Sequence, residues 1–275
     1  MSERRRWRAI RTLFLMTGLG LVAWAGFSWE AHAGAWTQRR GEGVWISTVQ
    51  VNRSNAAYDA DGAVIADRIF HKDEASQYGE IGLSDQTTLV TRLAWQTVRM
   101  RAGPNADSAE GLGASEIGLR RQLHTAGPYV VSSQLSVLIP GEGENLSNQP
   151  LGEGGWASDL RLLAGRSLDE GVFDGFVDAQ LGWRWRDGTR LDEARLDLTW
   201  GQALASRIDL LLQSHSVWSV EGGRGVQSSF AQHKLSASLL VEWRGRQVQA
   251  GVSTTPLGRN SQRERAVFFS VWRRF

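Results

Sequence analysis

The sequence contains no cysteine. Disulfide bonds and thiolate metal sites are therefore excluded, although an exported chain would be free to form disulfides. Neither sign of charge dominates, because 31 lysines and arginines stand against 29 aspartates and glutamates and both are scattered along the chain. A nucleic-acid-binding surface needs basic residues clustered on one face, so nucleic acid is not an expected partner.

Long apolar segments are absent after residue 33. No later stretch approaches the roughly 18 apolar residues that a membrane-spanning helix requires. This excludes a helical membrane protein. It leaves a β-barrel open, because each of its strands needs only about 9 to 11 residues to cross a bilayer.

The first 33 residues have the layout of an export signal. Five arginines precede an apolar run from Thr12 to Phe27, and the small-x-small site Ala31-His32-Ala33 follows. The alternative is an uncleaved anchor, but the run is short of the roughly 20 residues that an anchor needs. We predict a cleaved signal peptide over 1–33 and a mature domain over 34–275. Its net charge falls from +2 to −1, because the five arginines leave together with Glu3 and Glu30.

From Val44 onward the chain repeats segments of about ten residues in which apolar and polar residues alternate. In Val177–Arg186, every odd position is apolar and every even position is polar or glycine. This pattern predicts an all-β fold, a single antiparallel up-and-down transmembrane β-barrel of about twelve strands. The expected strands are 44–53, 74–84, 87–99, 112–124, 128–139, 156–168, 172–186, 191–201, 206–219, 229–243, 246–254 and 264–275.

The expected connections alternate between tight turns and longer polar loops. Turns are expected at 84–85, 125–127, 169–171 and 245, and loops at 54–73, 100–111, 140–155, 220–228 and 255–263. Short periplasmic turns and longer outer loops are typical of outer-membrane barrels.

A water-soluble β-sandwich also shows alternation, but it hides its apolar face against a second sheet. Tryptophans favour the membrane interpretation, because they mark strand ends as the aromatic girdles of a barrel do. Trp200 and Trp243 are expected on one rim, and Trp95, Trp183 and Trp185 toward the other.

The last strand ends on Phe275 after Val267, Phe269 and Val271 at two-residue spacing. Such an ending resembles the signal read by the bacterial barrel-assembly machinery, although Arg273 departs from the pattern at an expected apolar position. The resemblance implies this machinery as a partner, together with outer-membrane lipid.

Three segments carry a resemblance to a known family: Tyr58–Gly62, Phe70–Glu74 and Gln77–Asp85. They resemble the opening of the meta-pathway phenol-degradation group of outer-membrane proteins. In this chain, Gly82-Leu83-Ser84-Asp85 stands where that group has a similar turn. The resemblance covers about residues 44–98. It implies a transporter of small, often aromatic compounds, and it names no substrate.

Alternation also predicts which side chains face the lumen. The candidate lumen-lining residues carry both signs of charge: Glu80, Arg92, Glu116, Arg120, Asp159, Arg161, Asp178, Arg184, Arg195, Asp197 and Glu242, together with Glu193 and Asp209. A strongly charge-selective pore would carry a ring of one sign. Mixed charges in a confined space indicate that these side chains form structural ion pairs. The second interpretation is that they line a polar permeation path or a binding site.

No catalytic, metal-binding or cofactor-binding motif is found. Outer-membrane lipid hydrolases use a compact His-x-Ser motif, and none of the histidines after residue 33 has serine two positions later. Distant serine and histidine residues can still meet in space, so a hydrolase stays as a remote alternative. Asp59-x-Asp61-Gly62 starts like a calcium loop but has Phe70 where the bidentate Glu is needed, which favours a plain turn.

The sequence therefore predicts an outer-membrane barrel that acts as a narrow channel or transporter for small solutes, hydrophobic or aromatic compounds among them. A structural or surface-interaction barrel without transport is the alternative. Whether the 54–73 loop folds inward and closes the lumen is left open by the sequence.

Overall fold

The computed structural model describes residues 34–102, 105–144, 155–170, 173–188, 190–220 and 229–275. The predicted signal peptide at 1–33 lies outside these residues, as do most of the predicted loops 140–155 and 220–228. Within the described ranges, no helix has the length and apolar character needed to cross a membrane.

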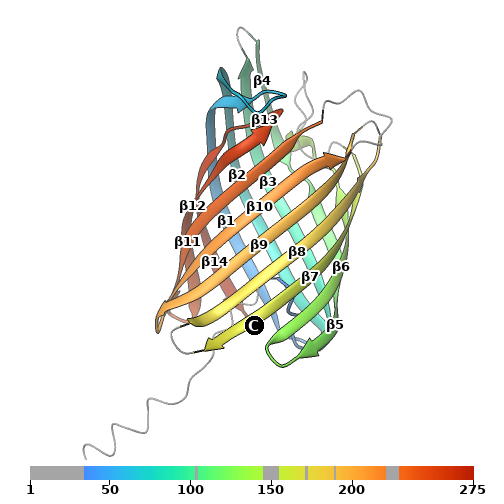
Figure 1. Ribbon diagram of the computed structural model, residues 1–275, viewed down its shortest axis with the longest axis vertical. Coiled ribbons are helices and arrows are strands. Elements are labelled where there is room, and N and C mark those ends of the chain that lie inside the picture. The colour runs from blue at the N-terminus through green and yellow to red at the C-terminus, as the bar shows by residue number, and fades with distance from the viewer. Residues whose placement is uncertain (1–33, 103–104, 145–154, 171–172, 189, 221–228) are drawn as a thin grey trace, which may run out of the picture. The chain divides into compact units, whose positions relative to one another are not determined.

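The described chain is built almost wholly of antiparallel strands joined in chain order (Figure 1). The strands are β1 (Gly43–Tyr58), β2 (Val64–Ser84), β3 (Thr87–Ala102), β4 (Asn105–Leu112), β5 (Ser115–Ala126), β6 (Tyr129–Ile139), β7 (Ala157–Glu170), β8 (Phe173–Arg186), β9 (Asp192–Ala205), β10 (Ile208–Val220), β11 (Ala231–Trp243), β12 (Arg246–Arg259), β13 (Ser261–Gln262) and β14 (Arg265–Arg274), with one short 3-10 helix, η1 (Glu142–Glu144).

The sheet closes into a barrel because β14 pairs with β12 on one side and with β1 on the other. Closure also joins the two ends of the wall: Gly43 and Phe275 exchange backbone hydrogen bonds of 2.9 and 3.1 Å. β4 and β5 both pair with β3, one after the other, so they occupy a single place in the wall. The short β13 pairs only with the last two residues of β1, Ala57 and Tyr58. The predicted twelve-strand barrel is therefore confirmed.

Alternation places apolar side chains outside and polar side chains inside, as predicted. On β8, Leu181 is 61% exposed, whereas its inward neighbours Asp178 and Arg184 are 3% and 7% exposed. Apolar side chains exposed on the outer wall can contact the hydrocarbon of a membrane. The backbone N–H and C=O groups are paired with a strand on both sides, so they need no hydrogen bonds to water.

Connections of only two residues join β2 to β3, β5 to β6, β7 to β8, β9 to β10 and β11 to β12, all at one end of the barrel. By the rule for outer-membrane barrels this is the periplasmic end, and we call the opposite end the outer end.

Two predicted loops at the outer end are wrong. All of residues 54–73 except the turn 59–63 belong to β1 and β2, which stay paired up to Tyr58 opposite Val64. Residues 100–102 belong to β3, and residues 105–111 belong to β4, which pairs with it. Phe70 and Val98 are buried between these hairpins and pack with Met100 and Ala109. Apolar and polar residues need to alternate only where one face of a strand meets lipid. The strands can therefore extend beyond the last residue at which the sequence alternates.

The predicted loop 255–263 is wrong in the same way. β12 runs to Arg259, and Ser261 and Gln262 form β13 against Ala57 and Tyr58. The true turn between β1 and β2 is 59–63, where the Asp59 carboxylate accepts backbone hydrogen bonds from Asp61 (2.9 Å) and Ala63 (2.8 Å). Asp59 thus serves a plain turn. In the described ranges no cluster of three or more potential metal-ligating side chains occurs.

Candidate functional site

The structure places every candidate lumen-lining side chain on an inward strand position. β2 and β3 contribute Glu80 and Arg92, and β5 contributes Glu116 and Arg120. The other candidates lie on later strands: Asp159 and Arg161 on β7, Asp178 and Arg184 on β8, Arg195 and Asp197 on β9, and Glu242 on β11. That these residues line a path for solutes stays a prediction.

One group of these side chains forms a continuous ion-pair network across β7, β8 and β9. The Arg161 guanidinium bridges two carboxylates, with Nε 2.8 Å from Asp159 and Nη1 2.6 Å from Asp197. Arg184 donates from Nε to the other oxygen of Asp159 at 3.0 Å. Asp159 is 1% exposed. A carboxylate so far removed from water needs such partners.

The network extends to further inward residues of β8, β9 and β10. Glu193 receives contacts from Arg186 (3.2 Å) and Arg195 (3.3 Å). His215 Nδ1 lies 3.2 Å from Asp197. Acids and bases therefore neutralise one another within this wall, and no ring of one sign forms among the described residues.

A second buried ion pair joins β2 and β5. Arg120 Nη1 is 2.9 Å from Glu80, and the two side chains are 4% and 1% exposed. The Tyr78 hydroxyl donates to the same Glu80 oxygen, Oε1, at 2.6 Å. Glu116 accepts a longer hydrogen bond from Gln134 at 3.4 Å, and Arg92 pairs with Glu74.

A segment that precedes the first strand, residues 34–42, connects these two groups: residues 34–38 run inside the barrel wall, and residues 39–42 are exposed. The Ala35 amide donates to Asp178 at 2.8 Å, and the Ser132 hydroxyl donates to the Ala35 carbonyl. Arg120 Nη1 donates to the Trp36 carbonyl at 3.0 Å. The segment is thus held from β6, β8 and β5 at once. We call residues 34–42 the inner segment.

The inner segment continues along β2 and β3. The Gln38 amide donates to Thr88 Oγ1 at 2.8 Å, and its side-chain Nε2 donates to Glu80 at 2.7 Å. Gln38 is buried, and Thr88 is fully buried. The Glu80–Arg120 pair therefore joins the wall to the inner segment.

Apolar contacts also hold the inner segment. Ala35 is fully buried with Val130 and Leu163, two inward apolar side chains among polar neighbours. The Trp36 ring meets Phe176 edge-on, with ring centroids 5.7 Å apart. It also lies over Gly165, where a Cβ atom would be 2.6 Å from the indole. The sequence pattern did not identify this segment, although inward Val130, Leu163 and Phe176 break the expected alternation and were a possible signal.

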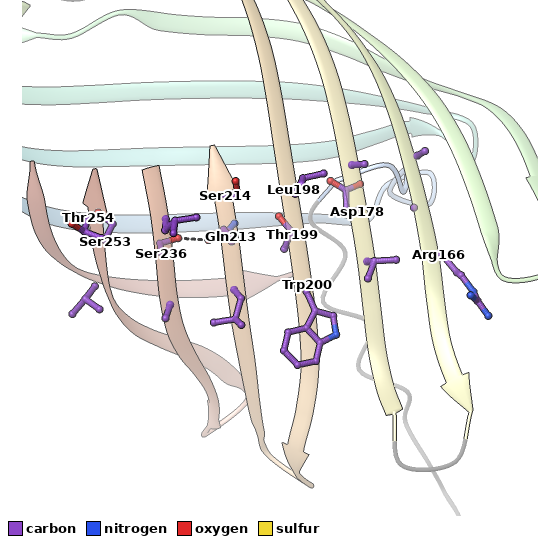
Figure 2. A pocket seen from close by; sticks show the side chains of 18 of the residues that line it. Arg166, Asp178, Leu198, Thr199, Trp200, Gln213, Ser214, Ser236, Ser253 and Thr254 are labelled. Carbon is purple, nitrogen blue, oxygen red and sulfur yellow. Dashed lines mark hydrogen bonds between the residues drawn. The ribbon is translucent and has the colours of Figure 1, made fainter. Parts of the chain in front are cut away.

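A pocket of about 860 Å³ follows the wall from β6 to β12 (Figure 2). Its polar members, such as Thr199, Gln213 and Ser236, are inward, and Ser236 Oγ lies 3.5 Å from Gln213 Oε1. Its apolar members, such as Leu198 and Leu235, are outward and exposed. We interpret this pocket as a hollow of the lipid-facing wall, because those exposed apolar side chains form its sides.

Serine and histidine do meet on the outward face, although no His-x-Ser motif exists. Ser216 Oγ and His233 Nδ1, on β10 and β11, are 2.6 Å apart. Among the residues that the structure describes, no carboxylate is bonded to His233, and Ser216 is only 4% exposed. A catalytic triad needs an acid that orients the histidine and a serine that the substrate reaches, so this pair is incomplete as a hydrolase site.

Comparison with known proteins gives no match to any family model and none among curated proteins. Solved structures do match. An outer membrane channel from Pseudomonas putida has a TM-score of 0.68 at 13% identity, over 88% of this chain and 98% of that chain.

Two autotransporter domains are also similar. The translocator domain of NalP from Neisseria meningitidis has a TM-score of 0.53 at 15% identity, over 98% of both chains. The β domain of BrkA from Bordetella has a TM-score of 0.52 at 13% identity, over 86% of this chain and 100% of that chain. At these identities the likeness shows the fold. The chain therefore has the fold of outer-membrane β-barrels, which both the alternation and the family resemblance predicted.

Proposed function

We propose that the chain is exported by its first 33 residues, inserted into the outer membrane and used there as a narrow channel for small solutes, with aromatic compounds among them. The observation that carries the proposal is the polar lumen with a separable inner segment. The wall closes through the pairing of β1 with β2 and β14, and residues 34–42 add backbone contacts to it only at Gly82 of β2. A barrel that served only as a structural wall would need no segment of this kind.

The width of the barrel supports small solutes. Barrel diameter grows with strand number: about eight strands leave just enough room for side chains, whereas porins with 16 to 18 strands hold a wide aqueous channel. A barrel of twelve strands lies between these limits. Its charged side chains project into the space and occupy part of it.

The pairing of the inward charges supports weak ion selectivity. Arg161 is shared by Asp159 and Asp197, and Arg120 by Glu80 and the inner segment. A selective filter presents uncompensated charge of one sign to the passing ion. We expect the opened lumen to pass small neutral solutes and ions of both signs.

Planar-bilayer recording tests the proposal. The intact mature protein is compared with a variant that starts at Gly43 and so lacks the inner segment. We expect low and intermittent conductance from the intact protein and a steady, larger conductance from the variant. As a matched control, the outer β1–β2 hairpin is shortened by equal numbers of residues from each strand beyond Ser54, which should leave conductance unchanged.

Two results would contradict the proposal. If the folded variant without residues 34–42 conducted no ions and admitted no small sugars into vesicles, the barrel would be closed by its wall and would have a structural or surface role. If the intact protein gave a large conductance with strong preference for one sign of ion, the paired-charge interpretation of the lumen would be wrong.

A further inference from the structure

A row of basic side chains crosses four neighbouring strands on the outward face of the barrel. Arg265, Arg53, His71 and Arg99 lie on β14, β1, β2 and β3, and each is directly opposite the next: Arg53 pairs in register with Arg265 and with His71, and His71 pairs with Arg99. We call these four residues the basic row.

The basic row faces outward because its members alternate in step with exposed apolar residues. Two positions before Arg53 on β1 is Val51, and two positions after Arg265 on β14 is Val267, which are 39% and 58% exposed. Residues between these positions, such as Asn52 and Ala266, are buried on the inward side. Side chains two apart on a strand share a face.

Like charges placed directly opposite one another across strands destabilise a sheet. In the described ranges the basic row has one ion-pair partner, Asp73, which binds Arg53. Glu110 on β4 is the other outward acid nearby, and its register partner is Thr97. Arg99 and Arg265 form no ion pair among the described residues. The row therefore carries uncompensated positive charge, which a bound anion would neutralise.

The position of the basic row indicates which anion it meets. The row lies where the outward apolar stretches end, after Val51 on β1 and before Val267 on β14, at the end of the barrel opposite the tight turns. In an outer-membrane barrel this is the boundary between the hydrocarbon and the outer headgroups. With strands about 4.8 Å apart, four neighbouring positions span about 14 Å.

We propose that the basic row binds the phosphate groups of lipopolysaccharide, the phosphorylated glycolipid of the outer leaflet, while its acyl chains lie against the apolar wall below. Arginine suits this ligand, because its guanidinium matches phosphate oxygens in a bidentate geometry. The inference rests on the outer-membrane placement given under the proposed function, and it is independent of whether the lumen conducts.

The test measures binding of purified lipopolysaccharide to the mature protein in detergent by native mass spectrometry. Arg99→Gln/Arg265→Gln removes the two arginines that lack ion pairs. A matched control, Arg207→Gln/Arg273→Gln, removes two exposed arginines from the periplasmic end. We expect about a tenfold loss of affinity for the first variant, as two partly solvated charge-assisted contacts predict, and none for the control. Heat-dependent gel mobility checks that each barrel is folded.

Three comparisons decide the proposal. Enzymatically dephosphorylated lipopolysaccharide should bind the unchanged protein as weakly as the intact glycolipid binds Arg99→Gln/Arg265→Gln. Equal binding of the phosphorylated and dephosphorylated forms would overturn the proposal, as would equal affinity of the two variants. Complete displacement of lipopolysaccharide by inorganic phosphate would also overturn it, since the row would then be a site for the free ion. If the bilayer recordings show no conductance while lipopolysaccharide binds as expected, only the proposed channel function is contradicted.

Discussion

Leu181 gives the sharpest test of which face of the wall meets lipid. It is the middle one of the five outward residues between Val177 and Trp185 on β8, with Val177 and Ala179 toward the periplasmic end and Trp183 and Trp185 toward the outer end. Its cross-strand partners on the outward face are Leu162 and Leu196. Leu181 therefore lies near the middle of the apolar band, where a charge is least tolerated.

Replacing Leu181 by lysine should destabilise the folded barrel by about 2 to 4 kcal/mol, the cost of a cationic side chain at the bilayer midplane on the lipid face of a barrel. This corresponds to roughly a 30-fold to several-hundred-fold change in the folding equilibrium. Asp178→Asn on the inward face of the same strand is the control. Its remaining side-chain oxygen still accepts a hydrogen bond from Ala35, so we expect a change below about 1 kcal/mol, the size of a single net hydrogen bond.

Reversible unfolding in guanidinium, with the protein in lipid vesicles, measures both variants, and tryptophan fluorescence with gel mobility follows the transition. The midpoint for Leu181→Lys should fall well below that of Asp178→Asn. Equal midpoints would refute the assignment of the lipid face. If the midpoint fell for Asp178→Asn and not for Leu181→Lys, the face that carries Asp178 would be the one that meets lipid.

Three further outcomes are expected. Sequencing the exported protein should give a mature N-terminus near Gly34, and recovery of a full-length product from the soluble periplasm would contradict this. Deleting Phe275 removes the ring that stacks on Trp45 at 6.2 Å and the terminal aromatic residue, so the amount of heat-modifiable barrel in the outer membrane should fall severalfold while synthesis is unchanged. Gly79→Val should impair assembly, because a Cβ at that position would overlap the Trp45 ring, whereas Ala75→Val on the same outward face of β2 should assemble normally.

The wall of the barrel could be predicted from the sequence because lipid and lumen impose a two-residue period on every strand. Strand β8 was expected at 172–186 and is found at 173–186. The orientation of Asp178 and Leu181 followed directly from that period. The two-residue period does not continue to the outer end, where residues 54–73 leave the apolar band. There the strands are held by backbone pairing and by the packing of Phe70 on Val98.

The inner segment could not be predicted in the same way. Its contacts join residues far apart in sequence, with Ala35 bound to Asp178 and Trp36 bound to Arg120. No period links the members of such a pair, and the segment has no regular structure of its own. The specific ion pairs could not be predicted either, because Arg161 can bridge Asp159 and Asp197 only when the register of β7, β8 and β9 is fixed.

The way the inner segment is held bears on how a lumen of this kind can open. Its polar contacts use groups that keep other partners in the wall: Arg120 still pairs with Glu80, and Asp178 still accepts from Gln180 at 2.8 Å. Removing residues 34–42 would therefore leave Arg120 ion-paired and Asp178 hydrogen-bonded to Gln180, and it would admit water, so little desolvation penalty would remain uncompensated. The apolar contacts of Ala35 and Trp36 oppose displacement of the inner segment, because displacement exposes these apolar side chains to water. Opening thus requires displacement of one short segment, and the paired strands of the wall need not move.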